Sequence, residues 1–253
     1  MISIKQLFKS FGKKPVLMGL DLDIERPGII AVLGPNGSGK TTLIKSILGM
    51  VLPTAGEVAI AGQNIKNQWQ HRRQIAYLPQ IARFPDNLTV RELLNMISDL
   101  RGKTADEARL IDLFELGPHL QARLGNLSGG TRQKVNIVLA FMYDCPLIIL
   151  DEPTAGLDPI SLVKLKELID YQRNMQKTIL ITTHVMSLVE ELADEVVYLL
   201  EGRIHFQGSL AHLKETYRET SVERAIAKLL EQQKRSLEFG SNGQHGLRPA
   251  LSA

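Results

Sequence analysis

Two groups of residues in this chain have the types and spacing needed to bind and cleave a phosphate anhydride. The first is the string Gly34-Pro35-Asn36-Gly37-Ser38-Gly39-Lys40-Thr41, in which a glycine and four further residues precede Gly-Lys-Thr. Glycines let backbone amides turn toward phosphate oxygens. Lys40 would then place its charge on the β and γ phosphates, and the Thr41 hydroxyl would ligate Mg²⁺. The spacing predicts a phosphate-binding loop that continues to Thr42.

The segments that flank this loop agree with the prediction. Ile29-Ile30-Ala31-Val32-Leu33 is an apolar run bounded by glycines, which is typical of a buried parallel strand. A helix is predicted from residue 40 to about residue 49, and its N-terminal end would face the anion. The alternative is a glycine-rich turn with a chance lysine, which the flanking strand and helix disfavour.

The second group is a pair of acids at the end of another apolar run, Pro146-Leu147-Ile148-Ile149-Leu150-Asp151-Glu152. Ligands bind at the carboxyl ends of parallel strands. Asp151 would hold Mg²⁺, directly or through water, and Glu152 would polarise the water that attacks the γ phosphate. Such a pair taken alone is more often two solvated acids. Here the phosphate-binding loop itself predicts an acid at the end of a neighbouring strand.

With these motifs in place, the chain resembles the ATP-binding subunits of ATP-binding cassette (ABC) transporters over about residues 1–210. Leu127-Ser128-Gly129-Gly130 resembles the signature motif of that family. At the start of a helix expected over about residues 130–143, it offers a hydroxyl, free amides and the helix dipole to a phosphate. In the family this phosphate belongs to the nucleotide on the opposite subunit. The resemblance therefore implies an ATP site that is complete only in a head-to-tail dimer.

The resemblance also implies roles for four single residues. Phe11 stands where the family stacks an aromatic ring, more usually tyrosine, on adenine; the alternative is a buried core aromatic. Gln80 matches the glutamine that contacts Mg²⁺ or the attacking water. His184 matches the histidine that contacts the γ phosphate, although a lone histidine at a strand end is more often structural. Asp158 ends a loop that contacts the phosphate loop of the other subunit. Because no position essential to hydrolysis departs from the pattern, an active site is expected.

The expected fold is α/β, a P-loop NTPase cassette with a mainly parallel RecA-like core. An antiparallel β subdomain is predicted from residues 1–30 and 57–65, and a small helical subdomain from about residues 81–145, where Thr89-Val90-Arg91-Glu92 forms a capping box. The cassette would span residues 1–218, an amphipathic helix residues 219–239 and a disordered tail residues 240–253. That helix either docks on its own domain or contacts a partner. Its apolar stripe comprises Val222, Ile226, Leu229, Leu230 and Leu237.

Composition excludes several other classes of protein. The chain has 253 residues and a formal net charge of +3, which argues against a nucleic-acid partner because such binding needs a concentrated basic face. No stretch approaches the roughly 18 apolar residues of a membrane span, and the first residues lack the apolar core of a secretory signal. Cys145 is the single cysteine, so an internal disulfide is excluded and a reducing, cytosolic setting fits.

These observations predict an ATPase that dimerises on binding two ATP molecules and passes the motion to a membrane permease on a separate chain, as a homodimer or with a second ATPase. It would lie at the cytoplasmic face of the membrane. Residues 78–90 and 154–159 resemble the subfamily that serves export-type permeases, including multidrug, antibiotic and copper-enzyme maturation systems. Arg83 and Phe84 are candidate permease contacts or, equally, a solvated arginine and a phenylalanine folded back on the lobe. The alternatives are a soluble assembly ATPase of the iron-sulfur scaffold type and a module that binds nucleotide without turnover.

Overall fold

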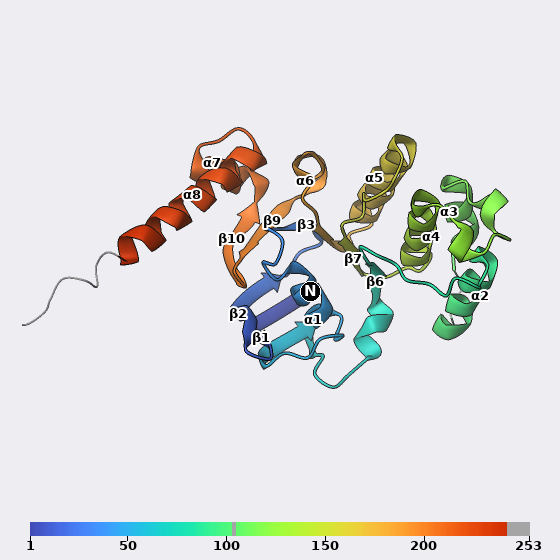
Figure 1. Cartoon of the computed structure of the whole chain (residues 1–253), viewed down its shortest axis with the longest axis horizontal. Helices are drawn as coiled ribbons and strands as arrows, with labels where there is room; N and C mark the ends of the chain where they lie inside the picture. The colour runs from blue at the N-terminus through green and yellow to red at the C-terminus, as the bar shows by residue number, and fades with distance from the viewer. Residues whose placement is uncertain (103–104, 242–253) are drawn as a thin grey trace, which may run out of the picture.

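Two sheets with helices packed around them make up the described part of the chain (Figure 1). This computed structural model describes the backbone of residues 1–102 and 105–241, and side chains as far as residue 233. The strands are β1 (Ile2–Phe11), β2 (Lys14–Ile24), β3 (Gly28–Leu33), β4 (Ala55–Ile60), β5 (Gln63–Asn64), β6 (Ile75–Leu78), β7 (Leu147–Asp151), β8 (Thr178–Thr182), β9 (Glu195–Leu200) and β10 (Arg203–Ser209). The helices are α1 (Lys40–Ile47), α2 (Val90–Arg101), α3 (Glu107–Leu113), α4 (Gly129–Phe141), α5 (Pro159–Asn174), α6 (Met186–Leu192), α7 (Leu210–Tyr217) and α8 (Val222–Ser241), with short 3₁₀ turns at Gln70–Gln74, Gly117–His119 and Leu124–Asn126.

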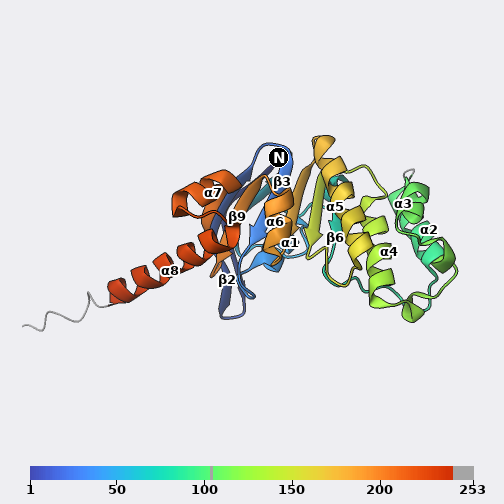
Figure 2. The same cartoon turned by 90° about the horizontal axis from the view of Figure 1, so that it is seen from above.

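The central sheet has the order β10-β9-β3-β8-β7-β6, and its strands are parallel except for the antiparallel edge strand β10. Every residue of β3, β7 and β8 is buried. This burial explains their unbroken apolar runs, because helices or a second sheet cover both faces of the sheet. Helix α1 and the second sheet cover one face, whereas α4, α5 and α6 lie on the other (Figure 2).

The second sheet is antiparallel with the order β2-β1-β4-β5. Its strands alternate buried and exposed residues over much of their length, as expected for a sheet with one face on the core. Residues of β1, β2 and β4 pack with α1 and with the apolar face of β3, in one shared core. The sheet thereby supports the helix that begins at Lys40.

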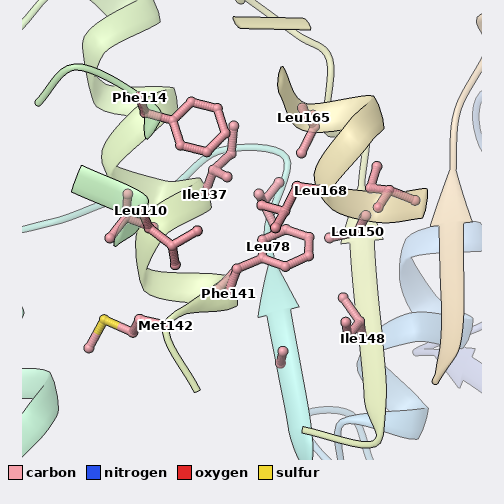
Figure 3. Packing of buried hydrophobic residues seen from close by; sticks show 14 of the residues in the cluster. Leu78, Leu110, Phe114, Ile137, Phe141, Met142, Ile148, Leu150, Leu165 and Leu168 are labelled. Carbon is pink, nitrogen blue, oxygen red and sulfur yellow. The ribbon is translucent and has the colours of Figure 1, made fainter. Parts of the chain in front are cut away.

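Helices α2, α3 and α4 form the helical lobe, which lies on the side of the central sheet where β6 is the edge strand (Figure 1). The capping box at Thr89 forms as predicted, because the Thr89 hydroxyl accepts from the Glu92 amide and the Glu92 carboxylate accepts from the Thr89 amide. Leu110, Phe114 and Ile137 of the lobe pack in the same core as Leu78 of β6 and Leu165 of α5 (Figure 3). The lobe and the sheet therefore share one apolar core.

Four predicted helices have different ends in the structure. The helix expected over about residues 130–143 is α4, Gly129–Phe141, and the helix expected over residues 219–239 is α8, Val222–Ser241. Helix α1 ends at Ile47 rather than near Gly49, which adopts the left-handed conformation (φ 66°) that commonly ends a helix. A helix predicted over residues 104–116 is α3, Glu107–Leu113. It ends before Glu115, which also has positive φ, and Thr104 lies outside the described residues.

Helices α7 and α8 follow β10 on the opposite side of the sheet from the helical lobe (Figure 1). Val222, Ile226 and Leu229 are buried against α6, α7 and the adjoining strands. This part of the expected stripe docks on its own domain, whereas the side chain of Leu237 and the predicted tail beyond residue 241 lie outside the described part of the chain. Among the described residues, no helix is long and apolar enough to cross a membrane.

Candidate nucleotide site

Four loops of the predicted site follow the carboxyl ends of four adjacent strands of the central sheet. In sheet order, β3 leads to the phosphate-binding loop, β8 to His184, β7 to Glu152 and β6 to Gln80. Asp151 is the last residue of β7 and pairs in register with Thr182 of β8. Because these strands are parallel, their carboxyl ends meet at the same edge. The topology thus gathers residues that lie far apart in the sequence.

The phosphate-binding loop has a backbone that only glycine permits at its first position. Gly34 has a φ of 150°, and a Cβ there would lie 2.0 Å from the carbonyl oxygen of Leu199. Gly37 and Gly39 also have positive φ, a conformation that other L-residues rarely adopt. Inside the loop, the Ser38 hydroxyl is buried without a hydrogen-bond partner. An unpaired buried donor at this place is consistent with a loop shaped to receive an acceptor from outside the chain.

Lys40, the first residue of α1, turns its ammonium back onto the loop. Its Nζ donates to the carbonyl oxygens of Gly34 at 2.7 Å and Pro35 at 3.1 Å. Burial lowers the pKa of Lys40, while the nearby carboxylates of Glu152 and Asp151 act in the opposite direction. The lysine is therefore held by neutral carbonyls beside two acids, and a phosphate would supply a stronger acceptor.

The two acids differ in their surroundings. Asp151 is buried, and one of its oxygens accepts a hydrogen bond from the Thr182 hydroxyl. Glu152 has a φ of 50°, and its amide donates to the Thr182 carbonyl oxygen at 3.0 Å. Its carboxylate is mostly buried and lies 2.9 Å from Nδ1 of His184, whose own side chain is 82% exposed. Strained backbone of this kind clusters at functional sites, and here it turns the Glu152 side chain toward His184.

A cavity of about 250 Å³ lies between the phosphate-binding loop and the two acids. Its wall includes two residues of β2 that the sequence analysis did not predict, Lys14 and Val16. No sequence signal marks them, because they reach the site only through the packing of the antiparallel sheet. The remaining lining residues are Asn36, Gly37, Gly39, Lys40, Thr41, Thr42, Gln80, Asp151 and Glu152.

Phe11 is not a buried core aromatic, because its side chain is 52% exposed at the end of β1. It pairs in register with Lys14, one of the cavity residues. Among the described residues, Phe11 is not part of the cavity wall itself. The Lys9 ammonium lies 4.8 Å from the centre of its ring, a cation–π contact. The ring is therefore accessible near the cavity.

The signature residues lie apart from this cavity, at the start of α4. Ser128 is the N-cap, and its hydroxyl accepts from the Thr131 amide at 3.2 Å. Gly129 and Gly130 form the first turn, and a Cβ on Gly130 would lie 3.0 Å from the carbonyl oxygen of Gly156. Among the described residues, none of the three signature residues lines the cavity. One copy of the chain therefore keeps its phosphate-binding loop and its signature sequence at separate places.

Asp158 is the N-cap of α5. It accepts from the backbone and hydroxyl of Ser161 and pairs with Lys134 of α4 at 3.0 Å. The Ser161 hydrogen bonds, followed by the Lys134 bond, hold the pKa of Asp158 well below its usual range. Asp158 thus joins the loop after Glu152 to helix α4.

Known protein families and individual proteins match much of this chain. A family model described as ABC transporter matches residues 17–155, and one described as AAA domain, putative AbiEii toxin, Type IV TA system matches residues 121–190. The chain is 35% identical over 214 residues to Nod factor export ATP-binding protein I of Burkholderia orbicola, covering 82% of this chain and 70% of that protein.

Two solved structures are similar to the chain as well. One is an ATP-binding subunit of an ABC transporter, with a TM-score of 0.85 and 31% identity, covering 91% of this chain and 99% of the other. The second is a dimeric post-hydrolysis state of the ATP-binding cassette MJ0796 bound to ADP and Pi. It has a TM-score of 0.73 and 26% identity, with 83% and 99% coverage.

Proposed function

The chain belongs to the ABC transporter family as its ATP-hydrolysing, energising subunit, and from this premise we propose how its residues divide the work. ATP drives two cassettes together, hydrolysis releases them, and a permease on another chain uses the motion. The main support for this proposal is that residues of the phosphate-binding loop, Asp151, Glu152 and Gln80 line the same cavity. In this proposal the cassette spans residues 1–218, with a helical subdomain at about residues 81–145.

The triphosphate lies along residues 34–42, and Lys40 exchanges the carbonyls of Gly34 and Pro35 for β and γ phosphate oxygens. This exchange favours ATP binding because an anionic phosphate oxygen attracts the ammonium more strongly than a neutral carbonyl oxygen does. The buried Ser38 hydroxyl gains a phosphate acceptor in the same step. The exposed ring of Phe11 stacks on adenine.

Mg²⁺ fits the oxygen donors present. The Thr41 hydroxyl, the Asp151 carboxylate and the Gln80 amide carbonyl belong to the same cavity, and hard divalent cations prefer such ligands. When bound, the ion neutralises charge on the β and γ phosphates. Asp151 is oriented for this role by the Thr182 hydroxyl.

Glu152 is the general base that orients and polarises the attacking water, and Gln80 contacts that water or the ion. His184 lies 2.9 Å from the Glu152 carboxylate and is exposed enough to reach a γ phosphate that enters the cavity. The positive φ of Glu152 fixes its carboxylate beside the phosphate-binding loop. A general base of this type contributes about 10²–10⁴-fold to the rate.

Two cassettes complete each site by dimerisation. Ser128, Gly129 and Gly130 of one subunit grip the phosphates bound to the other, and Asp158 places its loop against the partner's phosphate-binding loop. The similar MJ0796 cassette is a dimer. Because each ATP contacts both subunits, it binds the closed state more tightly and shifts the population toward it. The dimer is formed by two copies or by this chain and a second ABC ATPase.

Replacing Ser128 by Arg should block dimerisation without changing nucleotide affinity in the monomer. The long cationic side chain would occupy the space at the start of α4 where the partner's phosphate must fit, while the phosphate-binding loop is untouched. Binding of a fluorescent ATP analogue and molecular mass in the presence of ATP would be measured together. Normal dimerisation of this variant would contradict the assignment of Ser128.

For the partner we propose an integral permease of the export (ABC-2-like) type, which would place this subunit at the cytoplasmic face of the membrane. The similar protein from Burkholderia is described as a Nod factor export protein, and a finer possibility is the ATPase of a nitrous oxide reductase maturation transporter. The permease contact centres on the loop after Gln80, where Ile81 and Arg83 are exposed. Phe84 packs against the lobe core instead.

Purification from native membranes tests this partner. A tagged copy of the full chain, extracted in mild detergent, should bring a multi-helix membrane subunit with it, and Arg83→Glu should weaken that recovery. Recovery of the wild-type chain with soluble proteins alone would favour the alternative of an assembly ATPase.

A further inference from the structure

One turn of helix α4 makes three polar contacts with loops of the nucleotide site. Gln133 Nε2 donates to the Pro153 carbonyl oxygen at 3.2 Å, and Asn136 Nδ2 donates to the Pro79 carbonyl oxygen at 3.1 Å. Between them, Lys134 pairs with Asp158 at 3.0 Å. Pro153 directly follows Glu152, and Pro79 directly precedes Gln80. The helix that begins with the signature sequence is thus tied to both loops that carry the proposed water-handling groups.

The two amides are buried polar groups in an otherwise apolar region. Gln133 is 8% exposed and Asn136 is 3% exposed, whereas their neighbours on α4, Val135 and Ile137, belong to the apolar core. Asn136 Nδ2 also donates to the side-chain Oε1 of Gln133 at 3.5 Å. Buried amides stabilise a fold only when they are hydrogen-bonded, and an apolar residue of the same shape serves equally well for packing. Their contacts with the two loops therefore call for an explanation beyond packing.

Helix α4 connects the signature residues rigidly to the two amides. Ser128 and the turn that contains Gln133 and Asn136 belong to one continuous helix. At Gly130 that helix packs directly on the backbone of Gly156, because a Cβ there would lie 3.0 Å from the Gly156 oxygen. Because no space is left at this contact, a movement of the start of α4 cannot stay local. The movement must displace the loops that Gln133 and Asn136 contact, or break those hydrogen bonds.

We propose that Gln133 and Asn136 are positioning residues that couple the two ATP sites of the dimer. This inference rests on the proposed function, in which Ser128 of one subunit contacts the nucleotide of the other. When the partner's ATP engages the start of α4, Gln133 moves the backbone next to Glu152, and Asn136 moves the backbone next to Gln80, in the subunit's own site. Binding of ATP at one site thereby positions Glu152 and Gln80 at the second site. The two sites are then linked by a coupling free energy.

The test uses two shape-conserving variants of the full chain that remove the donors, Gln133→Met and Asn136→Leu. Asn95→Leu is the matched control, because Asn95 is exposed on α2. Steady-state ATP hydrolysis is measured against ATP concentration, and binding of a fluorescent ATP analogue is measured in the monomer at low protein concentration. For the parent and the control we expect a Hill coefficient approaching about 2, and for the two variants a value of about 1 with a lower kcat. Monomer affinity should stay unchanged throughout.

Three results would overturn the proposal. Variants that keep the parent's Hill coefficient and kcat would show that the amides carry no coupling, and a non-cooperative parent would leave no coupling for them to carry. Loss of monomer affinity in both variants would assign the amides to the general fold. The proposed function fails in a different way, through a Glu152→Gln variant that hydrolyses ATP at the parent rate.

Discussion

Replacing Glu152 by Gln is expected to lower ATP turnover by about 10²–10⁴-fold while ATP still binds. The amide keeps the size of the side chain but cannot accept the proton of the attacking water. Lys40, Thr41 and the loop amides are unchanged, so the contacts that hold the triphosphate remain. Because hydrolysis no longer opens the closed state, ATP should accumulate the dimer.

Light scattering coupled to size exclusion measures this effect directly. The Glu152→Gln variant should shift from one chain mass to two when ATP and Mg²⁺ are added, and should stay monomeric with ADP. Glu167→Gln is the matched control, because Glu167 is exposed on α5 away from the cavity, and it should hydrolyse ATP like the parent. Turnover near the parent rate in Glu152→Gln would disprove the assignment of the base. A persistent monomer that still binds ATP would indicate a different partner subunit.

The fold class and the main site loops could be predicted because their signals are local. Residues 34–41 contain the glycines that a backbone with positive φ requires, and the apolar runs before Gly34 and before Asp151 correspond to fully buried strands. Parallel strands place such loops at one edge, so the convergence of Lys40, Asp151 and Gln80 on one cavity follows from pattern and topology together. The roles of these residues remain predictions until the variants are measured.

The rest of the site depends on contacts between segments that are distant in the chain. Lys14 and Val16 enter the cavity wall through the packing of a second sheet, and nothing in the local sequence separates them from any other strand residues. Asn136 contacts a carbonyl 57 residues away, and Gln133 contacts one 20 residues away. A polar residue within a helix indicates exposure on sequence grounds alone. Only the tertiary structure reveals that these two amides are buried and paired.

Lys40→Ala is expected to weaken ATP binding by about two orders of magnitude or more, since hydrogen bonds to charged groups contribute roughly 1.5–3 kcal/mol each and this lysine would make two. The loss should appear in the monomer, before any dimer forms, in contrast to Ser128→Arg. The free protein should remain folded, because the Lys40 ammonium donates to the Gly34 and Pro35 carbonyls, which water can reach once the side chain is removed. The substitution also removes the cost of desolvating the Lys40 ammonium, which is the effect that lowers the pKa of Lys40 in the parent protein.

Calorimetric titration of the monomer with ATP and Mg²⁺ would measure the change. Lys45→Ala is the matched control, because Lys45 lies on the exposed face of the same helix and should leave the affinity unaltered. Equal losses in both variants would mean that the effect comes from helix stability or net charge. Parent-like affinity in Lys40→Ala would contradict the phosphate role of the lysine. In that case the backbone amides of the loop and the α1 dipole would have to hold the triphosphate without it, and the pairing of Lys40 with the Gly34 and Pro35 carbonyls would be structural.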